Sequence, residues 1–80
     1  MKLIILPRAK KQLKKLPKPE QVKITRKLTY LESGFIVGKQ LHAEYDEYLA
    51  VRAWPYRILY TIQGSTILIH AIKHRQGVYR

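Results

Sequence analysis

The residues of this chain that are best suited to chemistry lie close to its C-terminal end. A short segment after an apolar run holds Lys73, His74, Arg75 and Tyr79. An imidazole beside cations can transfer protons at neutral pH, and a tyrosine can donate a hydrogen bond or stack on a base. This combination suits a site that binds phosphate and moves protons, although a plain basic terminus would have the same composition.

Two arginines upstream, Arg52 and Arg57, occupy apolar stretches that are typical of neighbouring strands. A guanidinium group always carries its charge, so inside such a strand it needs either solvent or an anion. A hairpin between the two strands would bring both side chains onto one patch, where their forked N–H groups suit phosphate oxygens. The alternative is an ion pair with an acidic residue of the preceding segment, which holds Glu44, Asp46 and Glu47.

The net charge indicates a polyanionic partner. Sixteen Lys and Arg residues against five Asp and Glu residues give a formal charge of +11, which favours nucleic acid or an acidic protein. Residues 1–33 carry +8 of this charge and residues 34–80 carry +3. Four lysines of the first part form either the solvated face of a helix or a surface that contacts RNA. They are Lys10, Lys11, Lys14 and Lys15.

The composition also limits the class of protein. Eighty residues without a long polar stretch predict one domain over residues 1–80, and the absence of cysteine excludes disulfides and thiolate metal ligands. The apolar run at residues 3–6 is too short for a signal-peptide core or a membrane span, so we expect a soluble, cytoplasmic protein. His42 and His70 match no metal-ligand pattern, and we expect both to be structural.

The first half of the chain predicts a strand and two helices. Residues 3–6 are typical of a short strand, and Pro7 suits the first position of a helix, where its missing N–H needs no partner. Apolar residues then recur at helical spacing on both sides of a break at Pro17 and Pro19, and Ser33-Gly34 ends the second helix. The two apolar stripes are Ala9, Leu13 and Leu16, then Ile24, Leu28 and Leu31.

The second half predicts strands, because the apolar period changes to two and Tyr, Val, Ile and Thr become frequent. We expect strands at residues 48–54, 56–62 and 65–73, while residues 35–47 are either a loop or contain a short strand. The helices would cover one face of a mainly antiparallel sheet of about four strands, in a two-layer α+β domain. Alternation puts Arg57 on one face with Leu59 and Thr61, and one of the two faces of this strand is core. The other face holds Tyr56, Ile58, Tyr60 and Ile62. If the helices cover that second set, Arg57 projects from the open side of the sheet.

The order of three segments resembles the RelE/ParE superfamily of prokaryotic toxin–antitoxin systems. In that superfamily a basic helical hairpin precedes a strand pair with a Tyr-Arg step and a closing His-Arg-x-x-Val-Tyr. The matching segments are residues 9–16, 52–60 and 72–80, so the resemblance covers essentially the whole chain. The chain departs from the usual pattern at Ala50, where a further arginine is common, and at Trp54-Pro55, which replaces a Gly-Asp turn.

The resemblance implies a RelE-like toxin that cuts messenger RNA in the ribosomal A site without a metal or cofactor, and a cognate antitoxin that wraps and neutralises it. The positions that match the active-site motifs are Arg57, Lys73 or Arg75, and Tyr79, with His74 beside them. We hypothesise that a ribose 2′-hydroxyl attacks the adjacent phosphorus while Arg57 and Arg75 stabilise the developing charge. Lys73 would support them, and either His74 or Tyr79 would be the base or the acid.

Two other functions stay open on the sequence alone. A ParE-like protein would inhibit DNA gyrase without catalysis of its own, and a plain RNA-binding module would bind RNA without cutting it. Arg57 and the closing His-Arg-x-x-Val-Tyr segment favour the ribonuclease. The side chain of Trp54 would either pack at the sheet edge or anchor the antitoxin.

Overall fold

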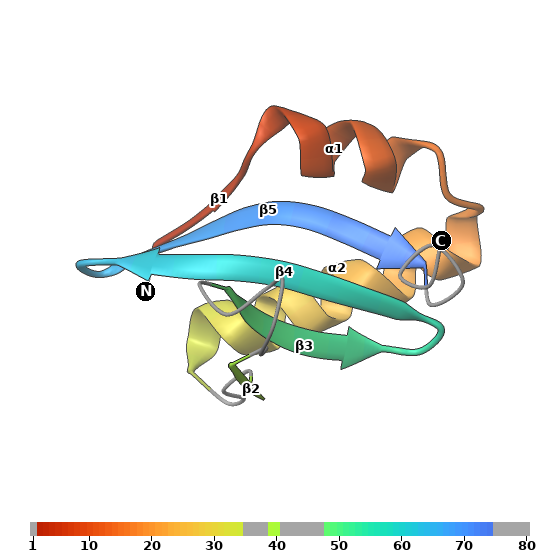
Figure 1. The fold of residues 1–80 in the computed structure, drawn as a ribbon. Helices are drawn as coiled ribbons and strands as arrows, with labels where there is room; N and C mark the ends of the chain where they lie inside the picture. The colour runs from red at the N-terminus through yellow and green to blue at the C-terminus, as the bar shows by residue number, and fades with distance from the viewer. Residues whose placement is uncertain (1, 35–38, 41–47, 75–80) are drawn as a thin grey trace.

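The described residues form two helices and five strands in the order β1, α1, α2, β2, β3, β4, β5 (Figure 1). This computed structural model describes residues 2–34, 39–40 and 48–74. The predicted α+β architecture is confirmed, and the strand β2 lies within residues 35–47, for which the sequence allows either a loop or a short strand. The helices are α1 (Pro7–Lys14) and α2 (Lys18–Ser33), and the strands are β1 (Lys2–Ile5), β2 (Lys39–Gln40), β3 (Leu49–Ala53), β4 (Tyr56–Gln63) and β5 (Thr66–His74).

These strands form one mixed sheet in the order β1-β5-β4-β3-β2. β1 runs parallel to β5, and every other neighbouring pair in the described sheet is antiparallel. A parallel pair needs a long connection, and here both helices and the other strands lie between β1 and β5 in the chain. β2 has only two residues, so the other four strands build most of the sheet. Since three of the four neighbouring pairs in the described sheet are antiparallel, the prediction of a mainly antiparallel sheet is confirmed.

The apolar stripes predicted for the helices face the core. Pro7 occupies the start of α1, and Ala9 is fully buried beneath that helix. Leu13 and Leu16 pack against the same core, whereas the four lysines predicted for the outer face are exposed. α2 buries the second stripe, which is Ile24, Leu28 and Leu31. Neither helix in the described part of the chain is long and apolar enough to cross a membrane.

The end of α2 depends on Gly34, which adopts the left-handed conformation with φ of 83°. Its N–H donates to the carbonyl oxygen of Leu31 at 3.1 Å and closes the last turn. A Cβ atom is disfavoured in this conformation, so we expect Gly34→Ala to lower the free energy of unfolding by about 1 kcal/mol in urea denaturation. Lys15→Ala is the control, because Lys15 ends α1 with φ of −81°. Equal losses in the two variants would contradict the prediction.

The main core lies between the helices and one face of the sheet. From β4 it takes Ile58 and Tyr60, which are 0% and 1% exposed, with Tyr56 packed against them, as alternation predicts. Ile62 has the same parity along β4 but is 45% exposed, because it lies beside the turn that joins β4 to β5. Arg57 lies on the opposite face, in agreement with the period of two along a strand.

Two glutamine side chains bond the helices to neighbouring backbone, one to β5 and one to the link between α1 and α2. β1 pairs with β5 only as far as Ile69, and beyond that point the N–H of Ile72 donates to Oε1 of Gln12 at 2.7 Å. This bond satisfies a backbone donor that the sheet leaves unpaired and holds α1 against β5 (Figure 1). In the link between the helices, Nε2 of Gln21 donates to the carbonyl oxygen of Leu16 at 2.8 Å.

Candidate functional site

A β-bulge in β5 decides which side chains reach the face of the sheet opposite the helices, called here the open face. Leu59 pairs with Ala71 and Tyr60 pairs with Ile69, so His70 is an extra residue in β5. Beyond His70 the alternation of side chains between the two faces is reversed. The sequence signal for the bulge is the spacing of the buried isoleucines of β5, which changes from two residues to three, at Ile67, Ile69 and Ile72.

The bulge puts Lys73 on the same face as Arg57, its partner in the register of β4 and β5. Arg52 on β3 pairs with Arg57 from the other side, as the predicted hairpin requires. Directly opposed residues on one face lie about 5 Å apart at their Cβ atoms, so three cationic side chains cross the sheet in a line. We call Arg52, Arg57 and Lys73 the cationic row. Within the described residues neither arginine forms an ion pair, and the acidic partners considered above fall outside those residues.

The predicted residues that follow Lys73 in the chain are not brought to the row by the described structure. His74 pairs with Tyr56, and their rings make an edge-on contact with centroids 5.2 Å apart. Because Tyr56 packs against the main core, this contact lies on the helix side of the sheet. Arg75 and Tyr79 lie outside the described residues, and their roles stay predictions.

A depression of about 330 Å³ adjoins the cationic row on the open face. Its wall includes Lys73 of the row, His70 and Tyr48, and Arg8 from the first turn of α1. Nε2 of His70 lies 2.7 Å from Oγ1 of Thr61, a hydrogen bond whose direction depends on the tautomer of the imidazole. The rings of Tyr48 and His70 meet edge-on, with centroids 5.0 Å apart. We call this depression the His70 pocket.

The floor of the His70 pocket is apolar. Leu59 and Ala71 belong to its lining, are each 4% exposed, and form a small cluster with Ala50. Ala50 stands where an arginine is common in the superfamily that the sequence resembles. At this position the alanine supplies no cation and instead extends the apolar floor.

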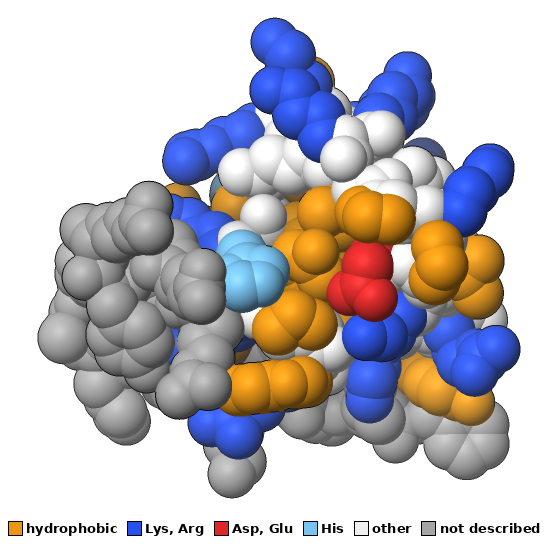
Figure 2. All heavy atoms as spheres, turned by 90° about the vertical axis from the view of Figure 1, so that its right-hand side faces the viewer, with side chains coloured by type: hydrophobic (Ala, Val, Ile, Leu, Met, Phe, Trp, Pro, Cys, Tyr) orange, Lys and Arg blue, Asp and Glu red, His pale blue; other side chains and the backbone are white. Residues whose placement is uncertain are grey.

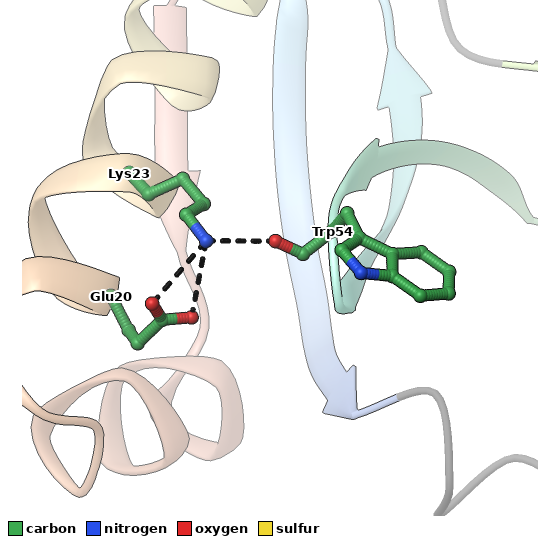
Figure 3. A network of polar contacts seen from close by, with 3 residues as sticks. All are labelled: Glu20, Lys23 and Trp54. Atoms are coloured by element: carbon green, nitrogen blue, oxygen red, sulfur yellow. Dashed lines mark hydrogen bonds and ion pairs between the residues drawn. The ribbon is translucent and has the colours of Figure 1, made fainter.

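A polar network ties the turn between β3 and β4 to α2. Nζ of Lys23 donates to the carbonyl oxygen of Trp54 at 2.8 Å and lies 3.3 Å from the carboxylate of Glu20 (Figure 3). Arg52 and Arg57 flank this turn, so the network helps to fix the end of the hairpin that carries them. The indole of Trp54 is 60% exposed and points away from α2 (Figure 3).

We expect Lys23→Met to lower the free energy of unfolding by roughly 1 kcal/mol, because it removes a charged donor from a backbone carbonyl at a partly exposed site. Methionine keeps an unbranched apolar stem, so the packing of the side chain is largely retained. Lys23→Arg is the matched control, since it keeps the charge and the donors. Urea denaturation measures both variants, and wild-type stability in Lys23→Met would show that the network does not stabilise the turn.

Basic side chains surround an apolar area on the side of the molecule that holds the β3–β4 turn and the link between the helices (Figure 2). Figure 2 shows apolar side chains at the centre of this side of the molecule, with lysine and arginine side chains projecting around them. The lysines predicted to contact RNA all lie on the exposed face of α1 or just after its end. Their binding role stays a prediction.

Across the described segments, no three His, Asp or Glu side chains are grouped so as to hold a metal ion.

Three residues of the His70 pocket do not stand out as site residues in the sequence. Nothing local distinguishes Tyr48 from the other strand tyrosines or Arg8 from the other cations, and the sequence predicts a structural role for His70. The structure places all three around one depression next to Lys73. The detectable signal was a histidine at the point where the apolar spacing of a strand changes.

The fold is that of a small toxin from a toxin–antitoxin system. Residues 3–79 match the family model described as the ParE toxin of the type II toxin–antitoxin system parDE. The chain belongs to this family, because the match spans nearly its whole length, and the predicted membership of the RelE/ParE superfamily is confirmed. A search of curated protein sequences finds no match.

Solved toxin structures share the architecture. The toxin–antitoxin complex RelBE2 from Mycobacterium tuberculosis contains a chain with a TM-score of 0.77 and 26% identity, over 92% of this chain and 96% of that chain. A chain of the RelB–RelE antitoxin–toxin complex from Methanococcus jannaschii has a TM-score of 0.73 and 20% identity, over 95% and 94%. The YoeB dimer from Staphylococcus aureus has a TM-score of 0.72 and 22% identity, over 92% and 95%. The predicted RelE-like fold is thereby confirmed.

Proposed function

We propose that this toxin is an endoribonuclease that cleaves messenger RNA on the ribosome and so inhibits translation. The observation that carries the proposal is the cationic row, in which Arg52, Arg57 and Lys73 are consecutive cross-strand neighbours on the open face. RNA presents phosphate groups in series, and forked guanidinium groups bind phosphate oxygens by pairs of hydrogen bonds. The row therefore suits an RNA backbone that crosses the sheet.

Without a bound anion, the cationic row lowers the stability of the folded sheet. Like charges placed directly opposite each other on one sheet face repel and lower stability. A sheet built for stability alone would separate Arg52 from Arg57 or give them carboxylate partners, and within the described residues no such partner is present. An anionic ligand that binds both guanidinium groups offsets the repulsion, which supports phosphate binding as the purpose of the arrangement.

The chemistry needs no group beyond acids, bases and cations. A base takes the proton of a ribose 2′-hydroxyl, and the 2′-oxygen bonds to the adjacent phosphorus. The bond from that phosphorus to the 5′-oxygen of the next nucleotide breaks, and an acid protonates the leaving oxygen. The products are a 2′,3′-cyclic phosphate and a 5′-hydroxyl end. Cations act where charge accumulates, on the phosphoryl oxygens of the transition state.

In this proposal Arg57 and Arg75 stabilise the transition state and Lys73 supports them. Of the two predicted candidates for base and acid, this proposal keeps Tyr79, because the His74 ring contacts Tyr56 on the helix side of the sheet and not the face of the row. Of the residues that the structure describes, Arg57 is the firmest choice, because it stands at the centre of the row with a cation on each neighbouring strand. The cytoplasm, where ribosomes translate, is the proposed place of action.

The exposed lysines of the α1 region give a prediction about salt. If Lys10, Lys11, Lys14 and Lys15 contact ribosomal RNA, replacing them together by glutamine reduces the dependence of binding on salt. Each lost phosphate contact lowers the slope of log affinity against log salt concentration by about 0.7 to 0.9. Ribosome binding by purified toxin between low and moderate salt measures the slope. An unchanged slope would mean that these lysines are only a solvated helix face.

The antitoxin is the second proposed partner. The complexes from Mycobacterium tuberculosis and Methanococcus jannaschii pair a toxin of this fold with an antitoxin. The formal charge of +11 suits an acidic antitoxin that wraps this chain and covers its cationic surface.

Inhibition of DNA gyrase is the second candidate function, and the match to the ParE family model favours it. Induction of the toxin in cells, with and without the neighbouring gene product, separates the two. The ribonuclease predicts new 5′ ends in mapped messenger RNA and normal plasmid supercoiling, both restored to the uninduced state by the antitoxin. Altered supercoiling with intact transcripts would instead establish the gyrase inhibitor. Binding of RNA without either effect would indicate a plain RNA-binding module.

A further inference from the structure

We infer that the His70 pocket binds one nucleobase of the RNA, beside the phosphate that the cationic row holds. The inference rests on the proposed ribonuclease function and gives it a site for base recognition. The pocket, of about 330 Å³, lies on the same face as the row. It combines an apolar floor, two aromatic rings and two cations, which is the combination that a nucleotide requires.

The pocket and the row are contiguous because they share Lys73. This residue pairs with Arg57 in the sheet register and also lines the pocket. Leu59 on the pocket floor follows Arg57 by two residues on the same face of β4, a spacing of about 7 Å along a strand. A nucleotide whose phosphate sits on Arg57 and Lys73 can therefore extend its base over Leu59.

The walls and floor suit a flat aromatic ligand. Leu59 and Ala71 present a low apolar surface, since alanine leaves space that a longer side chain would fill. The rings of Tyr48 and His70 are inclined at 75° to each other, so a base that lies against one ring meets the edge of the other. Aromatic side chains beside a cationic track are the usual way in which proteins hold the bases of single-stranded nucleic acid.

The polar groups of the pocket can read the edge of a base. Nε2 of His70 is engaged with the hydroxyl of Thr61 at 2.7 Å, which orients the ring and leaves Nδ1 for a ligand. Arg8, on the α1 side, adds guanidinium donors. His70 is also the extra residue of the β-bulge, and bulges are frequent next to active sites because they redirect a side chain. The bulge thus gives the histidine and Lys73 their common face.

Direct binding to the full-length toxin tests the inference. Each of the four nucleoside 5′-monophosphates and, as a base-free control, ribose 5-phosphate are titrated while amide chemical shifts are followed by NMR. We expect at least one nucleotide to bind about tenfold more tightly than ribose 5-phosphate, with shifts at Tyr48 and His70. Tyr48→Ala and His70→Ala should remove this difference, while Tyr48→Phe should keep it. Tyr30→Ala is the matched control, because Tyr30 is 41% exposed on the outer surface of α2.

Equal binding of nucleotides and ribose 5-phosphate by the wild type would overturn the inference. The inference would also fail if Tyr30→Ala lost the preference for a nucleotide as fully as Tyr48→Ala. Weaker antitoxin binding in Tyr48→Ala without base-dependent nucleotide binding would assign the pocket to the antitoxin instead. The test is separate from that of the ribonuclease itself. Messenger RNA cleavage without base-dependent binding rejects the pocket alone, whereas base-dependent binding without cleavage supports the pocket and rejects the ribonuclease.

Discussion

Arg57→Ala is expected to reduce cleavage of messenger RNA on translating ribosomes by about 100- to 1000-fold, the usual effect of removing one well-placed donor to a charged transition state. The side chain stands between Arg52 and Lys73 in the sheet register, so its loss divides the cationic row. Single-turnover cleavage of a defined transcript, with toxin in excess over programmed ribosomes, measures the chemical step directly.

The fold of the Arg57 variant should be preserved. Removing a charge from between two like charges relieves repulsion, so the free energy of unfolding should not fall. Arg26→Ala is the matched control, since it removes an exposed arginine from the outer surface of α2 and should cleave within about threefold of wild type. Full cleavage by a folded Arg57→Ala protein would remove this residue from the active site.

Ile69→Ala is expected to lower the free energy of unfolding by about 2–5 kcal/mol, because it leaves a cavity in the main core. Ile69 is 0% exposed and lies on β5, between its partners on β1 and β4. Small domains have total stabilities of roughly 5–15 kcal/mol, so this loss is a large share of the whole. Urea denaturation of the free toxin gives the value.

Ile62→Ala provides the matched control for the core. It makes the same chemical change on the neighbouring strand β4, at a side chain that is 45% exposed, and should cost less than about 1 kcal/mol. Similar losses at the two isoleucines would show that burial does not govern the stability of this sheet.

Much of the architecture follows from the sequence because its signals are local. Helical spacing of apolar residues identified both helices, and Gly34 ended the second one as its left-handed conformation requires. Alternation in the second half of the chain put Ile58 and Tyr60 on one face of the strand and Arg57 on the other, and the structure shows that the first face is core. The pairing of Arg52 with Arg57 follows from the length of the turn between β3 and β4.

The site was less accessible to sequence analysis, because its composition depends on the bulge in β5. Strict alternation would put Lys73 on the same face as Ile69 and the imidazole of His74 on the face of His70. The extra residue reverses this assignment and moves Lys73 to the row. The contribution of Arg8 depends on how α1 lies over the sheet, a tertiary contact that no local pattern in the chain contains.

The most direct test of the ribonuclease uses purified full-length toxin and ribosomes programmed with one defined messenger RNA. The transcript is supplied in two forms, all-ribose and with a 2′-deoxynucleotide on the 5′ side of the mapped cleavage site. If the toxin is the proposed ribonuclease, the all-ribose form is cut to a 2′,3′-cyclic phosphate and a 5′-hydroxyl end, and the deoxy form is not cut there. An intact all-ribose transcript, under conditions in which the same toxin inhibits DNA gyrase, would contradict this proposal.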